Sequence, residues 1–194
     1  GERSGPGDTD LILYSLSKYL RLAVKGNPTA LLPLFAPESD VLVATSAGQR
    51  LRDLRTSFLS QQAVERFLGY MHSQHERMLG RGKQNRVPNR PELIERYGWD
   101  VKYGSHALRL AHQGYEIAVY GTLTLPLAPG IREHVLAVKQ GQYTRDEVSR
   151  EITRLETQVR GLLDNGGTLL PEKPDIETIE SWMIETQLHH WVLR

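Results

Sequence analysis

The spacing of hydrophobic and polar residues along this chain predicts a mainly helical protein. Apolar residues recur at three- and four-residue intervals, which is the period of an amphipathic helix packed on a core. Ser15 and Ser60 stand where N-capping residues are expected, and Thr144 and Glu147 have the spacing of a capping box. Together these signals predict helices over residues 15–25, 29–35, 47–58, 61–79, 91–97, 100–113, 114–120, 131–139, 144–163 and 175–191.

Three short segments have the composition or the alternation of β-strands. They cover residues 11–14, 41–43 and 122–125, and the last is either a strand or an extended arm. A strand as short as the first is not stable by itself, so we expect it to pair with a sheet that the rest of this sequence does not supply. The predicted fold class is therefore mainly α with a few short strands.

The helix predicted from residue 100 carries a polar stripe. Lys102, His106, Arg109 and Gln113 follow one another at spacings that place them on one side of a helix. A cation, an imidazole, a guanidinium and an amide in a row form a surface suited to an anionic, planar ligand. The alternative is a polar face that is simply solvated, as on most amphipathic helices.

Composition narrows the class of protein without identifying it. The sequence has 194 residues, of which 39% are hydrophobic and 24% charged, enough for a globular domain with a sizeable core. The net charge of +1 gives no global attraction to nucleic acid, so a basic site has to be local. Cysteine is absent, which excludes disulfides and favours a cytoplasmic location. No apolar run in the sequence is long enough to span a membrane.

A second basic region follows the helix predicted over residues 61–79. Arg81, Lys83 and Arg86, with Arg77 and Arg90 on either side, lie close together in a stretch rich in glycine and arginine. Cations without a nearby counter-charge predict contacts with the phosphates of RNA or of a nucleotide. A flexible, solvated loop is the alternative.

Two acidic residues precede the first predicted strand. Asp8 and Asp10 stand at alternate positions, and residues two apart on a strand point to the same side. Two carboxylates in this arrangement can share a hard cation such as Mg²⁺. Because no second pair of carboxylates accompanies them, an acidic loop explains the same pattern.

Four segments of the chain stand in a recognisable order: SLSKYLRLAVKGNPTALLPLFAP (15–37), RPELIERYGWDVKYGSHALRL (90–110), GTLTLPL (121–127) and GQYTRDEV (141–148). Together they resemble the bacterial and phage nucleotidyltransferases of the DNA polymerase beta superfamily, from about residue 8 to about residue 163. The Gly-Ser turn and first Asp-x-Asp of that superfamily have no match upstream, and Asp10 matches the place of its third carboxylate. The sequence also starts without Met, so we expect a processed chain or a piece of a longer one.

This resemblance implies the helical C-terminal portion of an α+β nucleotidyltransferase. Residues 1–14 would be a linker and the edge strand of its sheet, and residues 15–194 a helical domain. The implied reaction is the Mg²⁺-dependent transfer of a nucleoside monophosphate from a nucleoside triphosphate to an unknown acceptor, RNA among the candidates. Asp8 and Asp10 are the implied catalytic carboxylates and metal ligands. The residues that match the family's nucleotide contacts are Lys18, Arg21, Lys102, His106 and Arg109.

Two other functions fit parts of the pattern. A non-catalytic helical module that binds RNA or a protein partner would use the same basic loop and helix faces. A helical ribonuclease would use Arg66 and His72, but their spacing sets the two side chains ~120° apart around a helix.

Overall fold

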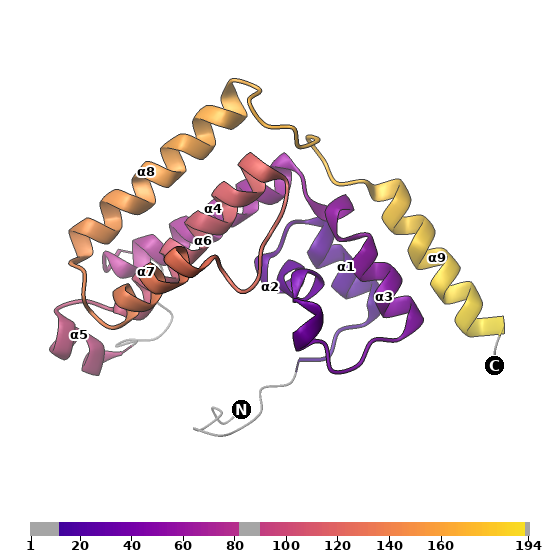
Figure 1. The fold of residues 1–194 in the computed structure, drawn as a ribbon, viewed down its shortest axis with the longest axis horizontal. Coiled ribbons are helices and arrows are strands. Elements are labelled where there is room, and N and C mark those ends of the chain that lie inside the picture. The colour runs from indigo at the N-terminus through magenta and orange to yellow at the C-terminus, as the bar shows by residue number, and fades with distance from the viewer. Residues whose placement is uncertain (1–11, 82–89, 193–194) are drawn as a thin grey trace.

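The computed structural model describes residues 12–81 and 90–192, and this part of the chain is mainly helical (Figure 1), as predicted. The principal helices are α1 (Leu16–Val24), α3 (Ser46–Asp53), α4 (Gln61–Met78), α6 (Val101–Tyr120), α7 (Pro129–Lys139), α8 (Arg145–Asp164) and α9 (Ile176–Val192). Shorter helical segments are α2 (Pro28–Leu31), η1 (Leu32–Phe35), η2 (Glu38–Asp40), η3 (Arg55–Phe58) and α5 (Pro91–Tyr97). None of the helices described is both long and apolar enough to cross a membrane.

The helices form a bundle, an N-terminal group and an arm (Figure 1). α4, α6, α7 and α8 make up the bundle, in which α6 contacts each of the other three helices. The short helices α1, α2 and α3 gather near the start of α4. Helix α9 (yellow) lies on the far side of this N-terminal group and is joined to α8 by an extended stretch.

The packing of α4 on α6 forms the centre of the bundle. Gly114 of α6 lies against α4, where an added Cβ would be 3.5 Å from the Cβ of Phe67. Near the other end of the pair Gly104 faces Met78, so the two helices run antiparallel. Helix α8 covers α6 with buried side chains at helical spacing, namely Val148, Ile152, Leu155 and Val159.

The N-terminal helices meet α4 at one close contact. Ser15 caps α1, as the sequence predicts, and Asn27 caps α2. Between the two helices Gly26 has a left-handed backbone (φ +70°), and an added Cβ there would be 2.5 Å from the Cα of Ala63 in α4. The side-chain amide of Asn27 also donates a hydrogen bond to the hydroxyl of Tyr70 in α4 (2.8 Å). These contacts hold the end of α1 beside α4.

Helix α9 is attached through its first half. Ile179 and Trp182 are its buried residues, and just before the helix the backbone N–H of Asp175 donates to the carbonyl of Ser57 (2.9 Å). Toward the other end Trp191 is 76% exposed. The helix is therefore an arm that is anchored at one end.

The predicted strands are absent where the structure describes the chain, and for residues 122–125 the alternative of an extended arm remains. Residues 12–14, 41–43 and 122–125 are not in strand conformation, and Leu42 and Val43 are almost fully exposed. A short apolar segment becomes a strand only when another strand pairs with it, and the neighbouring elements in the described ranges are helices. Residues 1–11 lie outside those ranges, so for the N-terminal linker and edge strand only the part before residue 12 stays a prediction.

Candidate functional site

The start of α6 is held by contacts that orient its first turns. Asp100, only 5% exposed, caps the helix by accepting hydrogen bonds from the backbone N–H groups of Lys102 (3.0 Å) and Tyr103 (3.2 Å). Its other carboxylate oxygen pairs with Arg90 (2.9 Å), whose guanidinium lies 4.9 Å from the centre of the Tyr103 ring. These contacts fix the position of the first turn of α6, where the polar stripe begins with Lys102.

Replacing Asp100 with alanine is expected to destabilise the protein by about 2 kcal/mol. The substitution removes the N-cap, worth about 1 kcal/mol, and leaves the partly buried Arg90 without its carboxylate. Urea unfolding measures the change. Asp100→Asn keeps an oxygen for the cap and should cost about half as much. Equal losses in the two variants would show that the charge, and not the cap, dominates.

Three residues of the predicted polar stripe form an electrostatic cluster with a residue of α4. Lys102 is exposed, whereas His106 and Arg109 are partly buried. Burial, and then the positive charges of Arg109, Arg77 and Lys102, lower the pKa of His106 to about 4. Burial also lowers the pKa of the Arg109 guanidinium. At neutral pH the cluster therefore presents three cations around a neutral imidazole, an arrangement suited to phosphate oxygens.

The fourth residue of the stripe does not belong to this surface. Gln113 is 1% exposed, and neither its Nε2 nor its Oε1 has a hydrogen-bond partner in the described part of the chain. The helical spacing is as predicted, but the second half of α6 lies inside the bundle, where Gly114 and Ile117 are also buried. The expectation that Gln113 contributes to a ligand surface is therefore wrong.

The lowered pKa of His106 predicts a loss of stability in acid. The unfolded ring binds a proton near its ordinary pKa of 6.5 and the folded ring only near 4. The folded state is therefore favoured fully above pH 6.5, and this contribution is lost as the pH falls toward 4. Because the ring is only partly buried, solvent screening limits the effect to about 1–2 kcal/mol.

Chemical denaturation of wild type and His106→Gln between pH 7 and pH 4 measures this effect. Burial also lowers the pKa of His75 and of His112, so both proteins lose stability in this range. The wild type should lose about 1–2 kcal/mol more than His106→Gln. Parallel curves would mean that His106 titrates at its ordinary pKa.

A matching stripe on α4 extends the cationic surface toward α1. Arg66, Tyr70 and Arg77 lie on one side of α4 by their spacing, and the Arg66 guanidinium is 5.8 Å from the centre of the Tyr70 ring. The contacts of Gly26 and Asn27 with α4 occur at this same place, because the Cβ of Arg66 lies 3.3 Å from where a Cβ of Gly26 would be. The stripe on α4 therefore links the cluster around His106 to the end of α1.

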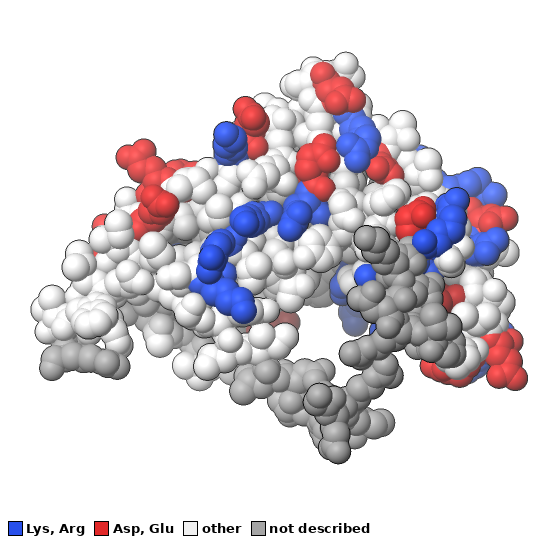
Figure 2. All heavy atoms as spheres, turned by 180° about the vertical axis from the view of Figure 1, so that it is seen from behind, with Lys and Arg blue, Asp and Glu red and all other residues white. Residues whose placement is uncertain are grey.

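Helix α1, whose end lies beside Arg66, carries exposed cations at helical spacing, Lys18 and Arg21, with Lys25 at its C-cap. We call the whole set the basic face: Lys18, Arg21 and Lys25 on α1, Arg66 and Arg77 on α4, and Lys102 and Arg109 on α6. None of these side chains forms an ion pair with a carboxylate of the described residues. Seen from behind, Lys and Arg side chains form a continuous run over the α1 side of the molecule, and most acidic side chains lie toward the edges (Figure 2).

The structure places the predicted nucleotide contacts on two helices. Lys102, His106 and Arg109 come together on α6, while Lys18 and Arg21 lie on α1 and are connected to them only through α4. The sequence analysis did not place Arg66 in the basic face. The spacing of Arg66 and Arg77 on a predicted helix already indicated that both lie on one side of that helix.

The predicted nucleic-acid contacts of the basic loop are described only in part. Arg81 is exposed and pairs with Glu76 (3.3 Å), so its charge is partly compensated. Lys83 and Arg86 lie outside the described residues, as do Asp8 and Asp10. Contacts of Lys83 and Arg86 with RNA therefore stay predictions.

The described residues contain no ready-made cluster of metal ligands. Within residues 12–81 and 90–192 no group of three His, Asp or Glu side chains is placed to hold a metal. The basic face itself offers cations and an imidazole, and Mg²⁺ prefers carboxylate oxygens and water. Metal binding by Asp8 and Asp10 remains a prediction.

Comparison with known protein families identifies the family of this chain. Residues 1–185 match the family model described as RlaP, RNA repair pathway DNA polymerase beta family. No curated protein and no solved structure gives a significant match. The resemblance to polymerase beta-like nucleotidyltransferases is thus confirmed at the level of the family, while the expected lack of an N-terminal motif is not. Because the match covers nearly all of the 194 residues, the chain belongs to the RNA repair pathway DNA polymerase beta family.

Proposed function

We propose that this protein transfers a nucleoside monophosphate from a nucleoside triphosphate to an acceptor, and that the acceptor is RNA. Membership of the family supports a polymerase beta-like nucleotidyltransferase role. The observation that carries the proposal is the cluster around His106, where Arg77, Lys102 and Arg109 converge without described carboxylate partners. A site of this kind attracts polyanions, the property that both substrates share.

Nucleotidyl transfer requires little covalent chemistry from the side chains of the protein. Catalysis of phosphoryl transfer depends mainly on positioning and on electrostatic stabilisation of the phosphate oxygens. Lys102 supplies charge at the surface. The partly buried Arg77 and Arg109 supply directed donors, and burial gives Arg109 a less polar environment, where an ionic contact is stronger. Neutral His106 can donate or accept one hydrogen bond without adding charge.

Polymerase beta-like nucleotidyltransferases generally use divalent metal ions. When bound, such ions activate the attacking oxygen and neutralise charge on the triphosphate. We assign the ligands to Asp8 and Asp10, and we assign only phosphate binding to the basic face.

The direct test is to incubate the protein with each of the four α-labelled nucleoside triphosphates, Mg²⁺ and a single-stranded RNA. Label should pass from at least one nucleotide to the RNA. Asp10→Asn should reduce transfer by about 100-fold or more, and Asp164→Asn, which changes an exposed carboxylate at the end of α8, should not. Full activity in Asp10→Asn would remove that carboxylate from the proposed chemistry.

A non-catalytic RNA-binding module would behave differently in the same assay. It would bind the RNA, show no transfer with any nucleotide, and show no Mg²⁺-dependent thermal stabilisation by a nucleotide. A ligand at ~100 times its dissociation constant stabilises a protein by about 2.7 kcal/mol, so the absence of a shift would be clear. That combination of results would contradict the proposed function.

A further inference from the structure

A separate pocket lies on another part of the bundle, between α6, α7 and α8. Its volume is about 320 Å³, near the lower end of the range for small-molecule sites. Helix α6 lines it with His112, Tyr115 and Tyr120, the start of α7 contributes Ile131, and α8 contributes Gln158. None of these residues belongs to the basic face.

The aromatic side chains give the pocket the character of a stacking site. Tyr120 is 70% exposed and available to a ligand, whereas Tyr115 and His112 are partly buried. The Nε2 atom of His112 is buried and has no hydrogen-bond partner in the described part of the protein. Burial lowers the pKa of His112, so at neutral pH this nitrogen belongs to an uncharged ring. The pocket therefore offers ring faces, and its histidine carries no charge that would oppose an uncharged ligand.

The charged side chains at the pocket already have hydrogen-bond partners within the fold. Arg154 donates to Glu151 from its Nε (2.8 Å) and to the side-chain oxygen of Gln158 from its Nη1 (2.9 Å). A carboxylate oxygen of Glu116 accepts from the backbone N–H of Thr124 (3.1 Å). With its arginine already paired, the pocket favours an uncharged planar group with polar edges over a phosphate.

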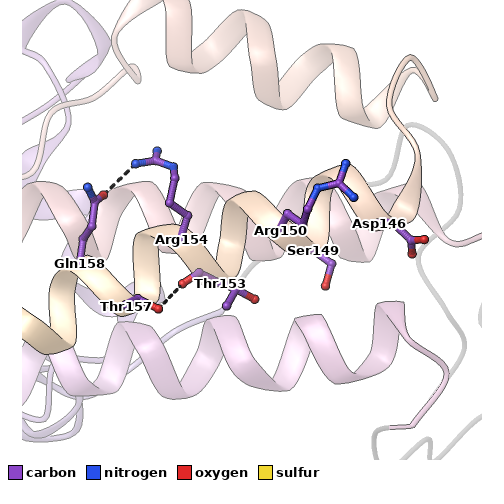
Figure 3. Close-up of a pocket in the computed structure, with 7 residues that line it drawn as sticks. All are labelled: Asp146, Ser149, Arg150, Thr153, Arg154, Thr157 and Gln158. Atoms are coloured by element: carbon purple, nitrogen blue, oxygen red, sulfur yellow. Dashed lines mark hydrogen bonds between the residues drawn. The ribbon is translucent and has the colours of Figure 1, made fainter.

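A cation available for a phosphate lies one helical turn away. Arg150 is exposed and forms no ion pair with a described carboxylate. Figure 3 shows Arg150 and Arg154 projecting from the same side of α8, while Ser149 points to the opposite side, where it contacts His75 of α4 (2.8 Å). Four residues of helix separate the two arginines by ~6 Å along the axis, within the reach of one nucleotide.

We propose that this pocket binds the base of a nucleotide, with the phosphate of that nucleotide on Arg150. The choice of a nucleotide as the ligand rests on the proposed function, whereas the stacking site and the adjacent cation are properties of this structure. The nucleotide is either free or an unpaired residue of an RNA strand, because the two share the base, the ribose and the phosphate. Tyr120 stacks on the base, and the side chain of Gln158 contacts its polar edge.

Calorimetric titration with four ligands tests the proposal. Adenosine monophosphate is compared with ribose 5-phosphate, and a short single-stranded oligoribonucleotide is compared with a ribose-phosphate strand of the same length in which every residue is abasic. Loss of a base–aromatic stack corresponds to roughly 5- to 140-fold in affinity, so Tyr120→Ala should weaken the base-containing ligands by this factor. The two ligands without the base should be unaffected.

Three further variants complete the test, and two of them, Ala128→Trp and Trp191→Ala, keep it independent of folding. Ala128→Trp fills the pocket from an exposed position and should weaken the same ligands as Tyr120→Ala. Trp191→Ala removes an exposed aromatic side chain of α9, far from the pocket in sequence, and should change nothing. Arg150→Gln should weaken ligands with and without the base alike, and reduce the salt dependence of binding by about one phosphate contact.

The ligands that respond identify the source of the nucleotide. A Tyr120 effect with adenosine monophosphate indicates a free nucleotide, and an effect with the oligonucleotide alone indicates an unpaired RNA residue. Wild-type affinity of both Tyr120→Ala and Ala128→Trp for all four ligands would overturn the proposal. If nucleotide transfer is absent but the Tyr120 effect on binding remains, the proposed function fails and the pocket stands.

Discussion

Neutralising three cations of the basic face is expected to weaken RNA binding by roughly 500-fold at ~50 mM salt. The variant carries Arg66→Gln, Arg77→Gln and Lys102→Gln, all at positions without a described carboxylate partner. Each phosphate contact on a single strand contributes about 0.7 to the slope of log affinity against log salt concentration, so the slope should fall by about 2. At ~200 mM salt the same loss of contacts corresponds to roughly 30-fold.

A control variant with the same net charge separates a local site from general attraction. Arg132→Gln, Lys139→Gln and Lys173→Gln change three exposed cations outside the basic face. Fluorescence anisotropy with a labelled single-stranded RNA, at several salt concentrations, measures both variants. The control should lose no more than about threefold. Equal losses in the two variants would mean that net charge and not the basic face determines binding.

Replacing Gly26 with alanine is expected to have the largest effect on stability, a loss of about 3–5 kcal/mol. The left-handed backbone alone costs an alanine about 1–2 kcal/mol. In addition, the new Cβ would lie 2.5 Å from the backbone Cα of Ala63, so α1 and α4 would have to separate. For a chain of this length the melting temperature should fall by about 10 °C or more.

A second glycine isolates the contribution of the close contact. Gly166 also has a left-handed backbone (φ +64°), but an added Cβ there would meet nothing within 4 Å. Gly166→Ala should therefore cost only about 1–2 kcal/mol. Because Gly26 joins α1 to α4, Gly26→Ala should also weaken RNA binding at the basic face. Similar melting temperatures for the two variants would show that α1 and α4 can move apart at Gly26 without a measurable loss of stability.

The helices were predictable because their signals are local. Ser15, Asn27, Ser60 and Thr144 each accept a hydrogen bond from a backbone N–H two or three residues ahead. Such a bond depends on nearby residues alone, and the periodic apolar face then shows which side is buried. The start of α6 follows the same rule, because the side chain of Asp100 accepts hydrogen bonds from backbone N–H groups in the first turn of the helix.

The strands failed for the opposite reason. Residues 41–43 and 122–125 have strand-like composition, but a strand needs a partner whose position the local sequence does not contain. In this structure Leu42 and Val43 stay exposed, and residues 122–125 pass over α6 as an extended arm, where the backbone N–H of Thr124 donates to Glu116. Tertiary surroundings decided the outcome in both segments.

By itself the sequence determined where most of the helices begin, although it divided α6 at residue 114, and it showed that α6 carries a line of cationic and polar residues. Only the tertiary structure decided that Arg77 and Arg66 of α4 extend this line toward α1, and that Gln113 is buried in the bundle. The spacing of residues along a helix follows from backbone geometry alone. Which part of that helix remains open to a ligand depends on side chains from elsewhere in the chain, such as Arg77, that pack against it.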